Sequence, residues 1–226
     1  MMADMAPDPS SDLTLDELRP QLIDAMLPHV PFDGWSGKAA AQGAADLGLA
    51  PAIARIAFPK GGIDMVSSYI ALADQRMLAA LDNDAFRGGK VRARIAGAIR
   101  TRLEAAAPHR EAVRRAVALL ALPRHAPRAA RIAWQTADSI WFAAGDTATD
   151  FNHYSKRAIA AAVYTATLLV WLNDDSDGFA DSWAFLDRRI EGVMRFERLK
   201  AKLRGAGNTE RPSLVRFLGR LRYPAV

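Results

Sequence analysis

The 226-residue chain contains no cysteine, which excludes disulfide bridges, thiolate metal ligands and a cysteine nucleophile. Histidine is scarce, with four scattered residues, and neither a Glu-x-x-His nor a His-Glu-x-x-His spacing occurs. Asp150 and His153 are the one pair in which a carboxylate precedes a histidine at helical spacing. Such a pair is more typical of a capped helix start than of a ligand set. We therefore expect no metal and no cofactor.

The chain also lacks a long hydrophobic run. Its longest apolar stretch, residues 158–172, is shorter than the ~20 residues that a membrane-spanning helix needs, and it predicts a buried core helix. The first dozen residues are acidic and contain Pro7 and Pro9, which is unlike a signal peptide. We expect a bacterial protein that is cytoplasmic and peripheral on the inner face of the membrane.

No alternation of apolar and polar residues is sustained, so the sequence predicts no strand and an all-α fold. Helical periodicity is interrupted by glycine, proline and cap-forming residues. The predicted helices span residues 15–27, 36–47, 51–57, 62–82, 90–106, 110–122, 128–144, 152–172 and 179–204.

The chain divides into five predicted parts. These are a disordered N-terminus (1–13), a helix-turn-helix-like module (14–62), a helical bundle (63–204), a linker (205–211) and an amphipathic helix (212–226). Residues 1–20 carry a net charge of −4, whereas residues 188–226 carry eleven Arg and Lys against three Glu, a net of +8. A basic end suggests an anionic partner such as lipid headgroups or nucleic acid. For residues 188–204, a solvated helix face is an equal alternative.

The C-terminal segment has one apolar and one basic face. Leucine and phenylalanine recur there at i, i+3, i+4 and i+7, with arginine on the other side. This pattern fits an interfacial membrane helix, and a helix docked on the core is the alternative. The predicted membrane-binding residues are Leu214, Val215, Phe217, Leu218, Leu221, Arg216 and Arg220.

Within residues 44–66, Gly48-Leu49-Ala50 is followed by Phe58-Pro59-Lys60. This spacing resembles the N-terminal module of the TetR family of regulators. The resemblance implies three small helices ahead of a ligand-binding bundle. A helix that reads DNA needs polar side chains at base edges, and in residues 51–57 only Arg55 could make a strong polar contact. We therefore expect no nucleic-acid partner, and a TetR-type ligand-responsive transcriptional regulator remains the alternative function.

Aromatic residues and carboxylates gather between Trp134 and Arg157. On a helix, Trp134, Asp138 and Trp141 would share one stripe, with Phe142 beside it. Both tryptophans could be core residues. A docking surface explains them better together with Asp138, because a buried carboxylate needs a partner.

Two longer motifs carry a closer resemblance. WxTADxxWFAAGDTxTDFNxYxKRA begins at Trp134, and WLNDDSDGFADSWAFLDRRI begins at Trp171. With the alanine- and leucine-rich helix between them, they resemble the lipid-binding accessory family of ubiquinone (coenzyme Q) biosynthesis, the ninth member of the coenzyme Q set. The resemblance extends over about residues 15–190, and that family is similar in fold to TetR regulators.

The resemblance implies a homodimer with an apolar pocket for an isoprenoid lipid or quinone intermediate and a C-terminal helix at the membrane surface. It also implies a surface that docks the di-iron hydroxylase acting on demethoxyubiquinone. That surface maps onto Asp138, Trp141 and Phe142, where Phe142 replaces a tyrosine common in the family.

The helix over residues 158–172 is the predicted pocket wall, although plain bundle core or a dimer interface would use the same pattern. The predicted lipid-binding residues are Tyr164, Leu168, Leu169 and Trp171. Asp138, Asp146 and Asp150 have no nucleophile, metal set or phosphate loop beside them, so we expect no enzyme activity.

Overall fold

The computed structural model describes residues 13–145 and 151–206, with side chains for 13–145 and 154–195. The described residues form helices and turns with no strand, which confirms the all-α prediction. The helices are α1 (Leu15–Met26), α2 (Val30–Asp33), α3 (Gly37–Asp46), α4 (Pro51–Ala57), α5 (Gly62–Leu81), α6 (Asp84–Arg87), α7 (Val91–Ala106), α8 (Arg110–Leu120), α9 (Ala126–Ala143), α10 (Phe151–Trp171) and α11 (Ala180–Ala206).

The sequence located nine of these helices to within two residues at most ends, and it missed the two single-turn helices α2 and α6. Helix α11 continues through Gly205 and Ala206, which the sequence assigned to the linker. The rest of the linker and the predicted membrane-binding residues 214–221 lie outside the described residues, as do Asp146 and Asp150.

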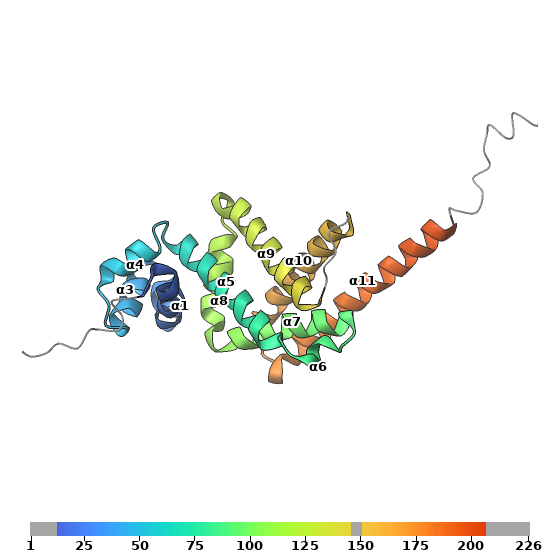
Figure 1. Cartoon of the computed structure of the whole chain (residues 1–226), viewed down its shortest axis with the longest axis horizontal. Helices are drawn as coiled ribbons and strands as arrows, with labels where there is room; N and C mark the ends of the chain where they lie inside the picture. The colour runs from blue at the N-terminus through green and yellow to red at the C-terminus, as the bar shows by residue number, and fades with distance from the viewer. Residues whose placement is uncertain (1–12, 146–150, 207–226) are drawn as a thin grey trace, which may run out of the picture.

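Helices α1, α3 and α4 form a small module at one end of the molecule (Figure 1). Thr14 and Glu17 begin α1 with a reciprocal capping box, and the Ser36 side chain accepts a hydrogen bond from Ala39 to begin α3. Helices α1 and α3 approach closely because residue 43 is glycine. A Cβ there would lie 2.7 Å from the Met26 nitrogen.

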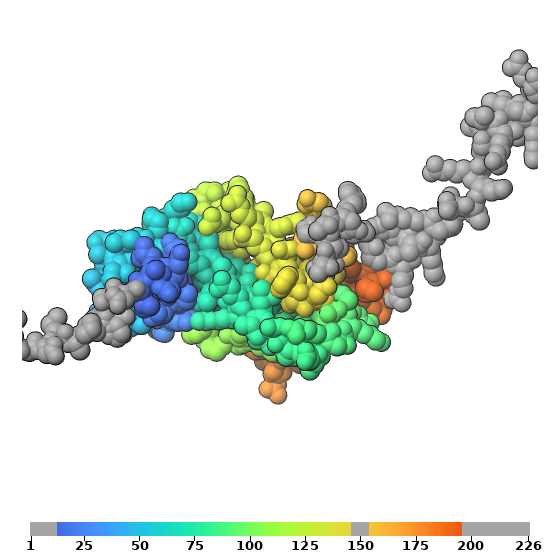
Figure 2. Space-filling model, viewed as in Figure 1, coloured from blue at the N-terminus to red at the C-terminus, as the bar shows by residue number. Residues whose placement is uncertain are grey.

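The module joins the bundle at the turn before α5. Gly61 has φ +66°, and a Cβ on Gly62 would lie 2.3 Å from the Trp35 carbonyl oxygen, so both glycines are required by the backbone path. The Trp35 indole donates a 2.9 Å hydrogen bond to the carbonyl of Ala112 in α8. Figure 2 shows the module lying directly beside the bundle.

The bundle surrounds a second core. Helix α5 packs on α7 and α9, and α10 packs on α9 and α11 (Figure 1). Its buried residues include Ile99, Leu103, Ile140 and Leu186, whereas the module has a separate core around Leu22, Met26 and Val66. No helix of the described residues is both long and apolar enough to span a bilayer.

The corner between α10 and α11 is organised by one buried carboxylate. Asp174 accepts hydrogen bonds from the backbone nitrogen and hydroxyl of Ser176, at 2.9 and 2.5 Å, and from the same groups of Ser182, at 2.8 and 2.5 Å. Burial alone would raise the pKa of Asp174, but these four donors outweigh it and hold the pKa below its ordinary value.

We expect Asp174→Asn to destabilise the fold by about 2 kcal/mol at pH 7, because hydrogen bonds to a charged acceptor contribute more than neutral ones. The folded-state pKa lies below the unfolded value near 3.9, so the wild-type advantage should be complete above that value and shrink as the pH falls through the folded-state pKa. Urea unfolding at several pH values measures this. Asp177→Asn, at an exposed position in the same corner, is the control and should change little.

Candidate functional site

The bundle encloses an apolar cavity of about 470 Å³ between α5, α7, α8, α9 and α10. This volume suits a ligand of drug-like size. Small residues on α9 leave the space open, and α8 contributes branched side chains on the facing wall. The cavity is lined by Tyr69, Ile70, Arg102, Leu103, Ala106, Val113, Ala116, Val117, Leu120, Ala121, Ala129, Ala130, Ile132, Ala133, Thr136, Tyr164, Thr165, Leu168 and Leu169.

The cavity has an exposed end and a buried end. Ala121, Ala130 and Leu169 are exposed to solvent and form its mouth. Arg102, Thr136 and Tyr164 are buried at its inner end. Thr165 is also exposed and lines the cavity, so an apolar guest would meet one hydroxyl at the exposed end and the other polar groups at the buried end.

An ion pair between α7 and α5 anchors the buried end. Arg102 donates to the Asp74 carboxylate at 2.6 Å, and their side chains are only 7% and 9% exposed. Thr136 of α9 donates to the other Asp74 oxygen at 2.9 Å, and Arg102 also donates to the Tyr164 hydroxyl of α10. The Arg102 guanidinium lies 5.0 Å from the Tyr164 ring centre. Each buried charge is therefore compensated by hydrogen bonds, as such pairs require.

The surroundings shift the acid–base properties of this cluster. Burial raises the pKa of Tyr69 to about 12 and raises the pKa of Tyr164 above its ordinary value. Burial also disfavours the charge of Arg102, but the oxygens of Tyr164 and Asp74 outweigh that effect and raise its pKa. At neutral pH both phenols are protonated and Arg102 is charged.

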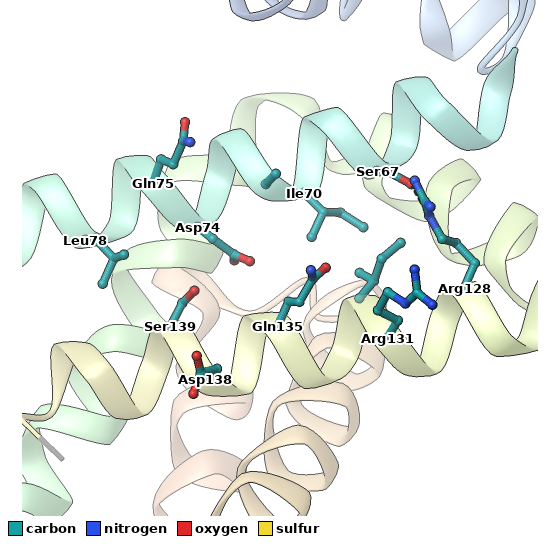
Figure 3. A pocket seen from close by; sticks show the side chains of 12 residues that line it. Ser67, Ile70, Asp74, Gln75, Leu78, Arg128, Arg131, Gln135, Asp138 and Ser139 are labelled. Carbon is teal, nitrogen blue, oxygen red and sulfur yellow. Dashed lines mark hydrogen bonds between the residues drawn. The ribbon is translucent and has the colours of Figure 1, made fainter. Parts of the chain in front are cut away.

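A polar groove of about 440 Å³ lies between α5 and α9 on the other side of this cluster. Figure 3 shows Asp74 reaching from α5 toward Gln135 and Ser139 of α9, with Arg128 and Arg131 farther along the groove. Ile70 and Ile132 line both the groove and the apolar cavity, whereas Asp74 lines the groove. The side chains of Ile70 and Ile132 therefore lie between the two spaces.

Three of the four predicted lipid-binding residues, Tyr164, Leu168 and Leu169, do line the cavity. Trp171 does not line the cavity, so the prediction that this residue lies on the pocket wall was wrong. Trp171 is fully buried and packs against Phe179, with a ring-centre distance of 5.6 Å. It lies two residues beyond Leu169, about 200° around the helix, and therefore faces the α11 side of the bundle.

The residues predicted to bind a partner lie at the C-terminal end of α9. Asp138 pairs with Arg157 of α10, and the Trp141 indole donates a 2.9 Å hydrogen bond to the Lys156 carbonyl. Asp138 is exposed, which does not fit the alternative that this stripe of α9 is plain core. Phe142 is 69% exposed and Tyr154 of α10 is 65% exposed. Asp138, Trp141, Phe142 and Tyr154 are called the α9–α10 surface below.

The sequence did not identify Asp74, Arg102, Thr136 or Tyr69 as site residues. A signal was present for two of them. Asp74 lies four residues after Ile70, and Arg102 lies three residues after Ile99, so a charged residue stands on the apolar face of each helix. Their pairing depends on how α5 and α7 cross, which one sequence does not reveal. Within the part of the chain that the structure describes, no three His, Asp or Glu side chains form a metal site.

The fold places the chain in the class of all-α proteins with a TetR-like architecture. It is similar to the crystal structure of the TetR transcriptional regulator from Nitrosomonas europaea, with a TM-score of 0.63 and 19% sequence identity. The match covers 77% of this chain and 96% of that chain. At this identity the likeness concerns the fold alone.

The family model described as COQ9 matches residues 126–197, which span α9, α10 and most of α11. Ubiquinone biosynthesis protein COQ9, mitochondrial, of Homo sapiens is 32% identical over 85% of this chain and 62% of its own length. The same-named protein of Drosophila melanogaster is 31% identical over 89% and 63%, and COQ9-B of Xenopus laevis is 31% identical over 84% and 68%.

The chain belongs to the COQ9 family. It spans slightly less than two thirds of the human and fly proteins that it matches. The TetR-like fold expected from residues 44–66 is confirmed together with the family.

We expect Asp74→Leu to destabilise the fold by about 3–5 kcal/mol, because it leaves the Arg102 charge buried and unpaired. Adding Arg102→Met should recover most of that loss, since the charge is then removed as well. Urea unfolding followed by circular dichroism measures both variants.

Asp24→Leu is the matched control. Asp24 of α1 pairs at an exposed position with Arg76 of α5, the helix that also carries Asp74. This substitution should cost less than about 1 kcal/mol. If Asp74→Leu cost no more than Asp24→Leu, the buried pair would not stabilise the bundle in the way its geometry implies.

Proposed function

We propose that this chain is a non-enzymatic lipid-binding accessory protein of ubiquinone biosynthesis. It holds an isoprenoid lipid or quinone intermediate in the cavity and presents it to the di-iron demethoxyubiquinone hydroxylase. The observation that carries the proposal is the apolar cavity of about 470 Å³ in a member of the COQ9 family. The relatives are named as ubiquinone biosynthesis proteins, which supports the pathway.

The physical requirement of such a carrier is an apolar wall. A polyprenyl quinone leaves the bilayer readily only if protein side chains replace its contacts with lipid tails. Leu103, Val113, Val117 and Leu168 provide that wall, and the exposed mouth at Leu169 gives a way in. A long polyprenyl tail has a larger volume than the cavity, so part of the tail would extend through this mouth to the outside.

The α9–α10 surface is the proposed docking site for the hydroxylase. Phe142 and Tyr154 are large apolar side chains left in solvent, which is costly unless a partner covers them. Trp141 is held by its bond to Lys156, and Asp138 by Arg157, so the surface is preorganised.

A homodimer and membrane contact complete the proposal. Helices α10 and α11 form an apolar groove of about 620 Å³ lined by Ile159, Val163, Ala166 and Val193, which suits a second copy of the chain. The amphipathic pattern of residues 212–226 supports peripheral binding to the inner face of the membrane. Two such helices in a dimer would strengthen that contact.

The alternative is a TetR-type regulator, which the fold favours. The exposed residues of α4 are Pro51, Ala52, Arg55 and Ile56. Ile56 is 60% exposed where a reading helix would place a polar side chain. This composition supports the accessory role over DNA recognition.

We expect organic extraction of the purified protein to yield an isoprenoid lipid or quinone detectable by mass spectrometry. Ala130→Trp, at the cavity mouth, should reduce the yield severalfold by filling the entrance. Ala158→Trp, at an exposed position of α10 outside the cavity lining, is the matched control and should leave it unchanged. Wild-type protein free of lipid, also after incubation with quinone-containing vesicles, would refute the carrier role.

We also expect Phe142→Ala to weaken binding to the hydroxylase by at least about fivefold, as removal of an aromatic anchor does. The melting temperature should stay within a few degrees, because Phe142 is 69% exposed. Surface plasmon resonance with the purified hydroxylase measures the affinity. Phe32→Ala is the control, since Phe32 is 85% exposed on the N-terminal side of the molecule. Equal affinity for wild type and Phe142→Ala would place the docking site elsewhere.

A further inference from the structure

The buried end of the cavity presents two phenol hydroxyls with hydrogens to donate. The Tyr164 hydroxyl accepts from Arg102, which leaves its own hydrogen without an acceptor among the bonds of the described residues. Tyr69 lines the same cavity and has no hydrogen bond to another described residue. Both lie within electrostatic range of Arg102.

The neighbouring Asp74 carboxylate accepts hydrogen bonds from other groups, and the described residues show none to it from Tyr69 or Tyr164. Each Asp74 oxygen receives one hydrogen bond, from Arg102 at 2.6 Å and from Thr136 at 2.9 Å. Tyr164 is only 7% exposed, so bulk water does not readily supply an acceptor. Buried donors are almost always paired, and an unpaired donor at the end of an apolar cavity indicates a ligand or water that accepts from it.

The charge of this end restricts the ligand further. The positive charge of Arg102 is balanced by Asp74 at hydrogen-bond distance, so the site is close to neutral. An anionic head group would have to lose its hydration, and it would find no unpaired cation in the site as a partner. An uncharged acceptor has no such cost, and a carbonyl oxygen has two lone pairs for two donors.

We propose that the inner end of the cavity binds the carbonyl oxygen of a quinone head, with the hydroxyls of Tyr69 and Tyr164 as donors. The tail then runs along the alanines of α9 to the mouth at Ala121, Ala130 and Leu169. This inference rests on the proposed carrier function and adds to it the polar group that is recognised and the direction in which the ligand lies.

The test uses the full-length chain and three probes with tails of equal length. They are a short-tailed ubiquinone, the corresponding isoprenoid hydrocarbon and the corresponding prenyl diphosphate. The affinity of each probe is measured by its displacement of one and the same fluorescent apolar ligand from the protein. Wild-type protein should bind the quinone about three- to tenfold more tightly than the hydrocarbon, the gain expected from one or two neutral hydrogen bonds, and should bind the diphosphate more weakly than the quinone.

Tyr69→Phe should remove most of the preference for the quinone and leave the affinity for the hydrocarbon unchanged, because only the hydroxyl is lost. Tyr164→Phe should act in the same direction. Thr101→Val, which removes a hydroxyl on α7 outside the cavity lining, is the control. Circular dichroism confirms that each variant is folded.

The outcomes separate this inference from the carrier function. If wild type binds quinone and hydrocarbon equally, or if Tyr69→Phe lowers both affinities by the same factor, the head-group contact is overturned while lipid binding stands. If the diphosphate binds more tightly than the quinone, an anionic ligand replaces the carbonyl. If no probe binds to wild type, the carrier function fails as well.

Discussion

The ion pair between Arg102 and Asp74 fixes the geometry on which the rest of the bundle depends. It joins α7 to α5, and its hydrogen bonds to Thr136 and Tyr164 extend it to α9 and α10. A buried charge tolerates little displacement of its partners, because each lost hydrogen bond leaves a desolvated polar group without a partner. Four helices are thereby held in register around one point. The apolar cavity opens immediately beside that point.

The cavity is the second consequence of this arrangement. Protein interiors normally pack without voids larger than a water molecule, and unfilled apolar space is destabilising. Here Ala129, Ala130 and Ala133 face the cavity from α9, where larger residues would close it. Half of the residues in the chain are apolar, so the open space does not result from a shortage of apolar side chains. That the space stays open is best explained by a guest that occupies it, in keeping with the carrier role we propose.

The sequence predicted the helices well because their boundaries are local. Thr14 and Ser36 cap helices, and Gly61 and Gly62 permit the turn before α5, all recognisable from residue type. It also assigned Tyr164 and Leu168 to a pocket wall, and both residues line the apolar cavity, while their binding of lipid stays a prediction. It failed for Trp171, since helical periodicity does not say which of two partners each face meets. Asp74 and Arg102 are separated by 28 positions, so their pairing follows from tertiary packing alone.

The cavity and the α9–α10 surface share the same two helices, and this shared support bears on how a ligand would be presented. On α9, Thr136 faces the cavity floor, whereas Asp138 two residues later is exposed and pairs with Arg157. On α10, Arg157 and Tyr164 lie two turns apart on one helix, and Tyr164 contacts Arg102. A partner bound at Phe142 and Tyr154 would therefore rest on the outer faces of helices whose inner faces hold the guest. Under the proposed function, a shift of α9 or α10 on docking would act directly on the cavity wall, because residues of these same two helices line the cavity.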